Sequence, residues 1–258
     1  MRSIYRINLF RELHKMNKTV LATLLAALST GVSAAETVRF ATEATYAPFE
    51  FVGADNKIQG FDIDLANALC KQMQAECTFT NQAFDSLIPS LRFRRFDAVI
   101  SGMDITPDRL KQVAFTQPYY ENSAIFVAQK GKFTDMASLA GKRVGMQNGS
   151  THQKYLMDKH LEITAVPYDS YQNAILDLKN GRLDSVFGDT AVVNEWLMKD
   201  AGLATVGDKV TDKAYFGTGL GIAVRQNNTA LLDKFNQALD KIRQDGTYQS
   251  LYQKWFKQ

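Results

Sequence analysis

Charged and hydroxyl side chains stand beside glycine or aromatic residues in four short segments of the sequence. In the first segment, residues 42–49, Glu43 lies close to Tyr46. A carboxylate beside an aromatic face is a suitable environment for a bound cation. The alternative is an ordinary loop, in which Glu43 is solvated and Tyr46 belongs to the core.

The second segment combines a glycine, acidic residues and an arginine. It reads Ser101, Gly102, Met103, Asp104, Ile105, Thr106, Pro107, Asp108 and Arg109. Gly102 lets a backbone amide approach a ligand closely, and Thr106 before Pro107 is typical of the cap and first position of a helix. On that helix, Arg109 could bind a carboxylate through two parallel hydrogen bonds. A surface ion pair is the alternative for Arg109, and Asp104 adds a second acidic group.

The third segment, residues 147–152, is a glycine turn followed by hydroxyl residues and His152. It predicts a helix that starts at Ser150 and Thr151, where free backbone N–H groups attract an anion. Plain N-capping by Ser150 is the alternative, and it is compatible with anion binding. In the fourth segment, Asp189 follows a glycine and either pairs with an ammonium group or caps the next helix.

The polar groups of these segments match the two charged ends of an α-amino acid. The guanidinium of Arg109 and the backbone amides at Gly102 and residues 150–151 suit a carboxylate. The carboxylate of Asp189 suits an ammonium group. The sequence therefore predicts a site that binds a free amino acid by both ends.

Two acidic groups and two aromatic rings remain for the side chain of that amino acid. Glu43 and Asp104 favour a cation, and Tyr46 and Phe84 offer faces for stacking. A guanidinium is planar as well as positively charged, so it suits these groups better than an ammonium does. Arginine is the favoured ligand, with lysine, ornithine and histidine as alternatives.

Strand and helix patterns alternate along the chain and explain how the four segments come together. The patterns predict strands at residues 37–41, 77–81, 98–101, 143–146, 163–168 and 185–188, and helices at 62–74, 86–93, 151–159, 171–179, 190–199, 229–245 and 247–256. Such alternation is typical of mostly parallel sheets covered by helices. Ligands of these folds bind beyond the carboxyl ends of strands, and each of the four segments follows an expected strand.

The sequence also contains one internal repeat. Residues 84–99 align without a gap to residues 171–186, with aromatic, aliphatic and Arg-x-Asp-x-Val positions in register. Two similar α/β units predict two sheets and two lobes, although two amphipathic helices can also resemble each other by chance. Apolar residues 123–128 and 219–224 bracket the second unit and are expected to form a two-strand hinge. We expect lobe 1 at residues 36–125 and 222–258, and lobe 2 at residues 126–221.

The first 35 residues predict a signal peptide. Basic residues precede the apolar run 20–28, and small residues end the segment at Ala34 and Ala35, as a signal-peptidase site requires. An uncleaved membrane anchor is the alternative. We expect a start at Met1 or Met16, cleavage after Ala34 or Ala35, and a mature protein that diffuses freely in the periplasm.

Removal of this segment changes the charge balance of the protein. Residues 1–35 hold five of the 30 basic and one of the 27 acidic residues, which leaves 25 basic and 26 acidic residues. The basic isoelectric point belongs largely to the leader, so nothing supports a surface for nucleic acid. No other stretch approaches the ~20 apolar residues that span a bilayer.

The sequence contains two cysteines, Cys70 and Cys77. Export would place them where disulfides persist, and a bond between them would stabilise the fold by roughly 2–3 kcal/mol. Two buried free thiols are the alternative. A zinc site is not favoured, because no histidine lies near the cysteines in the sequence.

Seven segments resemble those of a known family. They are TEATYAPFE (42–50), residues 60–91 beginning GFDIDLANALC, GMDITPDR (102–109), FTQPYYENSA (115–124), NGSTHQKY (148–155), RLDSVFGDTAVVNEW (182–196) and FGTGLGIAVR (216–225). The sequence resembles periplasmic polar-amino-acid-binding proteins of ABC transporters, and it is most similar to their arginine-binding members. The resemblance implies the type II two-lobed α/β fold, with two mixed sheets flanked by helices and joined by a two-strand hinge.

The resemblance also implies roles for the residues that match the family's motifs. It implies side-chain recognition by Glu43, Tyr46, Phe84 and Asp104, carboxylate binding by Gly102, Arg109 and Thr151, ammonium binding by Ser101 and Asp189, and a disulfide between Cys70 and Cys77. Histidine- and lysine-binding relatives usually have a small hydroxyl residue in place of Asp104, which favours arginine here. His152 stands where many relatives have glutamine, and it joins Met103 and Ser150 among the candidate ligand-binding residues.

These observations together predict the solute-binding component of an ABC importer. We expect a monomer that binds L-arginine between its lobes and delivers it to a membrane permease. No metal, cofactor or catalytic group is expected, because no general acid and base accompany a nucleophile. A dehydratase-like enzyme on the same scaffold and a free sensory protein are the alternatives.

Overall fold

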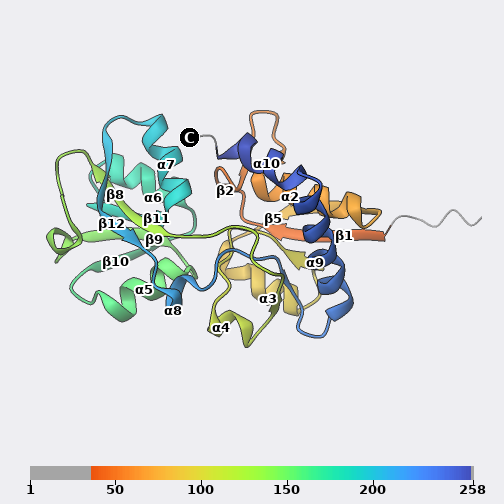
Figure 1. Ribbon diagram of the computed structural model, residues 1–258. Helices are drawn as coiled ribbons and strands as arrows, with labels where there is room; N and C mark the ends of the chain where they lie inside the picture. The colour runs from red at the N-terminus through yellow and green to blue at the C-terminus, as the bar shows by residue number, and fades with distance from the viewer. Residues whose placement is uncertain (1–35, 257–258) are drawn as a thin grey trace, which may run out of the picture. The chain divides into compact units, whose positions relative to one another are not determined.

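The computed structural model describes residues 36–256, and the expected signal peptide lies outside this range. Residues 36–256 form two five-stranded sheets and one three-stranded sheet (Figure 1). The first sheet has the order β5 (Ala75–Asn81), β1 (Glu36–Thr42), β6 (Ala98–Val99), β13 (Ala223–Val224), β7 (Ala114–Phe115). The second has the order β10 (Thr164–Tyr168), β9 (Arg143–Gln147), β11 (Ser185–Asp189), β8 (Ala124–Gln129), β12 (Leu203–Val210). The small sheet consists of β2 (Thr45–Tyr46), β3 (Glu50–Val52) and β4 (Ile58–Gln59).

Each five-stranded sheet is mixed, with its antiparallel strand in fourth place. β1 runs parallel to β5 and β6, whereas β13 is antiparallel to β6 and β7. In the second sheet, β9 runs parallel to β10 and β11, whereas β8 is antiparallel to β11 and β12. The chain passes to the second sheet between β7 and β8 and returns to the first sheet before β13. The α/β fold with two mixed sheets is therefore confirmed.

Helices cover both sheets. The first sheet carries α2 (Phe61–Gln72), α3 (Leu87–Arg92), α4 (Pro107–Leu110), α9 (Thr229–Gln244) and α10 (Thr247–Trp255), and α2, α9 and α10 pack against one another (Figure 1). The second sheet carries α5 (Thr151–Lys159), α6 (Tyr171–Lys179), α7 (Thr190–Lys199) and α8 (Lys213–Phe216). The sequence predicted α5, α6 and α7 at these bounds. Within residues 36–256, no helix is both long and apolar enough to cross a bilayer.

Two predicted strands are shorter in the structure. The strand expected at residues 98–101 ends at Val99, and the chain then turns through Gly102, whose φ is +48°. The strand expected at residues 219–224 is reduced to β13, preceded by isolated bridges at Leu220. In both places the backbone leaves the sheet as it approaches the region between the two sheets, so the expected pairing stops early.

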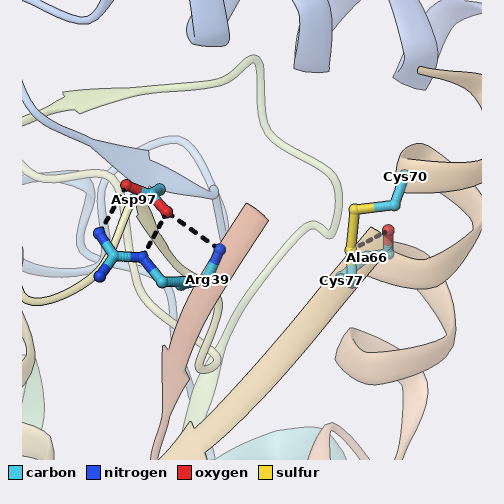
Figure 2. Close-up of a disulfide and its surroundings, with 5 residues drawn as sticks. All are labelled: Arg39, Ala66, Cys70, Cys77 and Asp97. Carbon is cyan, nitrogen blue, oxygen red and sulfur yellow. Dashed lines mark hydrogen bonds and ion pairs between the residues drawn. A yellow bond between two sulfur atoms is a disulfide. The ribbon is translucent and has the colours of Figure 1, made fainter. Parts of the chain in front are cut away.

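A disulfide joins Cys70 at the end of α2 to Cys77 on β5, and their Cα atoms are 6.0 Å apart (Figure 2). That separation is ordinary for a disulfide. Of the two alternatives, the bonded pair is therefore correct. The bond attaches α2 to β5, which is an edge strand of the first sheet.

The internal repeat has a structural counterpart. The carboxylate of Asp97 accepts hydrogen bonds from the backbone amide of Arg39 on β1 at 3.1 Å and from its Nε at 2.9 Å (Figure 2). The aligned Asp184 accepts a hydrogen bond from the backbone amide of Arg143 on β9 at 2.8 Å. Both copies thus tie the turn before a strand to the neighbouring strand, which supports a genuine repeat over chance resemblance.

Candidate ligand-binding site

The predicted polar residues come together where strands of the two large sheets end. The chain reaches them directly after β1, β6, β9 and β11. Eight of them are buried: Glu43, Ser101, Asp104, Arg109, Ser150, Thr151, His152 and Asp189. Tyr46 is also buried, Phe84 is partly exposed, and Met103 belongs to an apolar core cluster of the first sheet. The structure therefore gathers the charged candidates and directs Met103 into the core.

Asp104 and Asp189 share one hydrogen-bond donor although they follow strands of different sheets. The Nδ2 atom of Asn122 donates to Oδ1 of Asp104 and to Oδ1 of Asp189, both at 2.8 Å. Thr151 donates to the other oxygen of Asp104 at 2.7 Å. Burial, followed by the charge of Asp189, raises the pKa of Asp104 to about 7. Among residues 36–256 neither carboxylate forms a salt bridge with lysine or arginine, so this end of the site favours a cation.

The guanidinium of Arg109 is buried without a carboxylate partner among the described residues. It donates from Nη1 to the backbone oxygen of Asp104 at 3.0 Å and lies 5.4 Å from the ring centre of Phe84. Burial lowers the pKa of Arg109, and the charges of Asp104 and Asp189 oppose that shift. The surface ion pair considered from the sequence is therefore wrong. A guanidinium has five N–H donors, so several remain for an anion.

Local sequence explains how Arg109 is held. Thr106 caps α4 by accepting a hydrogen bond from the amide of Arg109 at 3.3 Å, and Pro107 occupies the first helical position, as predicted. A cavity of about 560 Å³ borders Arg109, Gly149 and Thr151. An anion could therefore reach the guanidinium beside the start of α5.

Glu43 is buried, which contradicts the alternative of a solvated loop residue. Thr45 donates to its Oε1 at 2.8 Å, and Gln147 donates to its Oε2 at 3.0 Å. Burial raises the pKa of Glu43. Gln147 lies in the third predicted segment but was not among the predicted site residues, since the sequence does not show that its side chain reaches Glu43.

The two predicted aromatic residues have different surroundings. The ring of Tyr46 stacks on Tyr171 with centroids 5.1 Å apart, and its hydroxyl accepts a hydrogen bond from the amide of Asp189 at 3.2 Å. Phe84 instead lies beside the guanidinium of Arg109. Tyr46 therefore joins β2 of the small sheet to the end of β11, while Phe84 packs beside Arg109.

Ser101 and the amide of Gly102 already have partners within the first sheet's lobe. The hydroxyl of Ser101 accepts from the amide of Glu43 at 2.9 Å and donates to Glu50 at 3.1 Å. The amide of Gly102 donates to Asp62 at 2.9 Å. In this structure the two groups hold the loop in place, and their predicted contact with a ligand stays a prediction.

The helix starts of the second lobe resolve two open alternatives. Ser150 caps α5 by accepting from the amide of Gln153 at 3.1 Å, so the capping interpretation is correct. Asp189 stands at the N-cap position of α7 but makes no capping hydrogen bond with its side chain. Its carboxylate faces His152, whose Nε2 lies 3.1 Å away but is not aligned for a hydrogen bond. Asp189 is therefore oriented toward the site.

The arrangement has two complementary ends. Arg109 and the start of α5 provide positive charge and N–H donors, whereas Asp104 and Asp189 provide buried negative charge. Hydrogen bonds between residues of the two sheets' strand ends, such as that from Thr151 to Asp104, bring these groups together. A small molecule with a carboxylate, an ammonium group and a further cation would satisfy the charges of both ends.

The profile of the bacterial extracellular solute-binding proteins, family 3, matches residues 38–258. The chain is 65% identical over 243 residues to ABC transporter arginine-binding protein 1 of Escherichia coli (strain K12), covering 94% of this chain and 100% of that protein. It is 48% identical over 240 residues to the arginine-binding periplasmic protein of Mannheimia haemolytica, covering 93% and 98%.

A solved structure of a Salmonella typhimurium periplasmic binding protein, described for its high arginine specificity, is similar with a TM-score of 0.84. The two sequences are 59% identical, and the match covers 86% of this chain and 100% of that one. The similarity therefore extends over both sheets and the segments that follow their strands.

Proposed function

Since the chain belongs to the bacterial extracellular solute-binding proteins, family 3, we propose that it captures L-arginine and delivers it to the permease of an ABC transporter. Like its relatives, it is a protein of the periplasm, as the leader sequence predicted. The relatives named for arginine support this ligand. It acts by binding and release, as a monomer, and leaves the amino acid chemically unchanged.

One observation supports this function above the others. A buried guanidinium, that of Arg109, lies near two buried carboxylates, Asp104 and Asp189, without forming a salt bridge to either. Buried charges are costly unless they are paired. A zwitterionic ligand with a cationic side chain would supply the missing partner for each.

The proposed contacts follow from this geometry. Arg109 and the start of α5 at Thr151 bind the ligand carboxylate, and Asp189 binds its ammonium group. Asp104 and Glu43 receive the guanidinium of the ligand, which is planar and offers several donors. Tyr46 and Phe84 flank its aliphatic and planar parts.

Closure of two lobes around the ligand completes the mechanism. We assign residues 36–125 and 222–258 to lobe 1 and residues 126–221 to lobe 2. Two hydrogen bonds join the lobes in the closed form. Gln147 donates to Glu43 at 3.0 Å, and Asn148 donates to Asp85 at 2.7 Å. Arginine stabilises this form because it binds the closed state better than the open one. The permease then binds the closed, arginine-loaded protein.

A thermal-shift screen of the mature protein against all amino acids tests this function. Arginine should raise the melting temperature most, with lysine, ornithine and histidine weaker. At a dissociation constant of about 1 μM, 1 mM arginine would stabilise the folded state by about 4 kcal/mol. A melting temperature raised only by non-basic amino acids would contradict the proposal, and turnover of the amino acid, followed by NMR, would favour an enzyme.

A further inference from the structure

Two buried acidic residues lie beneath the loop that carries Ser101 and Gly102. Glu50 on β3 is 1% exposed and Asp62 on α2 is 0% exposed. Neither residue was singled out from the sequence, and neither belongs to the proposed ligand contacts. Two neighbouring carboxyl groups in an apolar interior need a physical reason to be there.

One oxygen of each carboxyl group is hydrogen-bonded to the loop or its neighbours. Glu50 Oε1 accepts from the hydroxyl of Ser101 at 3.1 Å. Asp62 Oδ2 accepts from the amide of Gly102 at 2.9 Å and from the hydroxyl of Tyr119 at 2.8 Å. Because Ser101 also accepts from the amide of Glu43, the pair fixes two chain segments at once.

The other oxygen of each group has no hydrogen-bond donor among residues 36–256. These atoms are Glu50 Oε2 and Asp62 Oδ1. The charge of Asp62 nevertheless raises the pKa of Glu50, so the two carboxyl groups are neighbours. A single proton between the two groups would satisfy both remaining oxygens.

Electrostatics favours such a shared proton. Burial, followed by the charge of Asp62, raises the pKa of Glu50 well above its usual value, and burial raises the pKa of Asp62 to about 6. No lysine, arginine or histidine is among the main causes of either pKa shift. The other titratable groups that face the pair are Glu43 and Tyr119, so no cation replaces the proton. Two neighbouring carboxyl groups in a buried site do not both ionise readily.

We propose that Glu50 and Asp62 hold one proton between them and act as positioning residues, which keep the Ser101–Gly102 loop in the shape that binds the ligand. This inference rests on the proposed function and names further residues of the same site. Asp62 keeps its negative charge and accepts from Gly102, while protonated Glu50 donates to Asp62 and accepts from Ser101.

Two variants of Glu50 separate this role from simple packing. In Glu50→Gln the amide donates to Asp62 at every pH and its oxygen accepts from Ser101, so the variant reproduces the protonated acid. Glu50→Ala removes the donor and leaves a buried charge. By calorimetry at pH 7, we expect the arginine affinity of Glu50→Ala to fall at least about tenfold. Glu50→Gln should stay within about threefold of the unmodified protein.

The dependence of arginine affinity on pH provides a second test, because a role in packing alone would not change it. As pH rises and the shared proton leaves the pair, two buried charges repel each other, and the arginine affinity of the unmodified protein should fall relative to that of Glu50→Gln. The ratio of the two affinities removes the contribution of other titrating groups, such as Asp104. A constant ratio from pH 6 to 9, with Glu50→Ala binding normally, would show the proposal to be wrong.

Stability without arginine tests the pair separately from the function. Because the folded protein holds a proton that the unfolded chain has lost, the free energy of unfolding should decline as pH rises above about 4.5. In Glu50→Gln the slope of the unfolding free energy against pH should be smaller, by the amount that corresponds to about one bound proton. Equal slopes for the two proteins would contradict the shared proton. If the unmodified protein does not bind arginine, the proposed function is wrong. The slope still shows whether Glu50 and Asp62 share a proton.

Discussion

The two five-stranded sheets share one pattern of strand directions, but the chain leaves their equivalent strands in different ways. In the first sheet, β6 leads into an irregular loop at residues 100–106 before the short helix α4. In the second, β11 leads directly into α7 through Asp189. The repeated contacts of Asp97 and Asp184 belong to the shared framework. The framework is therefore duplicated, and the segments beyond the strand ends give each lobe its own chemistry.

This difference divides the recognition of one ligand between two kinds of local structure. The first lobe provides side chains from a loop and from α4, including Asp104 and Arg109. The second lobe provides the starts of two helices, at Thr151 and Asp189. A loop can place acidic and basic groups independently, whereas a helix start offers a fixed set of N–H groups.

The largest expected effect comes from the helix start of the second lobe. Replacing Asp189 by Ala removes the proposed partner of the ligand ammonium and should weaken arginine binding by at least about 100-fold, measured by calorimetry. The matched control is Asp184→Ala, one residue before the start of β11, which should bind arginine normally. Unchanged binding by the Asp189 variant would show that the second lobe does not recognise the ammonium group.

A smaller effect is expected from the loop of the first lobe. Asp104→Ser removes one buried carboxylate and should weaken arginine binding by about 10- to 100-fold, because it removes a charge-assisted hydrogen bond. The affinities for histidine and lysine should fall less. The ratio of arginine affinity to theirs, measured in competition titrations, should therefore decrease. If Asp104→Ser keeps the original preference for arginine, residues outside this loop determine the selectivity for the ligand side chain.

The same carboxylate predicts a pH dependence. Because the pKa of Asp104 is raised to about 7, the fraction of protonated Asp104 increases as pH falls through 7. The neutral acid attracts a cation less, so arginine affinity should decrease by up to about tenfold per pH unit below pH 7. Calorimetry at pH 6 and 8 measures this change. The dependence should be reduced in Asp104→Asn, whose side chain does not titrate.

The smallest effect is expected from a contact between the lobes that touches no ligand. Asn148 donates to Asp85 at 2.7 Å, and this pair is partly exposed. Removing it by Asp85→Ala should raise the dissociation rate of arginine by about 2- to 10-fold, as expected for one net hydrogen bond. Stopped-flow fluorescence measures the rate. No change would mean that closure does not depend on contacts outside the site.

Periodic parts of the fold were predictable from the sequence. α5, α6 and α7 have regular apolar spacing and recognisable starts, and their predicted bounds were confirmed. The alignment of residues 84–99 with 171–186 also predicted two similar α/β units. The strands β2, β3 and β4 were missed because segments of two or three residues show no period.

The candidate site was predictable as a set of residues but not as a network. Strand ends indicated where Glu43, Asp104 and Asp189 would gather. The contribution of Asn122 was not visible, because it depends on where the crossing segment passes between the sheets. Gly102 and Asp62 are 40 residues apart in the sequence, so no local pattern reveals that they are hydrogen-bonded.

The most direct test of the charge complementarity compares two ligands on the unmodified protein. L-citrulline has nearly the shape of L-arginine and the same charged ends, but its side chain is neutral. We expect calorimetry to give L-arginine a dissociation constant of about 0.1–10 μM and L-citrulline one at least about 100-fold higher. Equal affinities for the two ligands would contradict the claim that buried carboxylates bind the cationic side chain of the ligand.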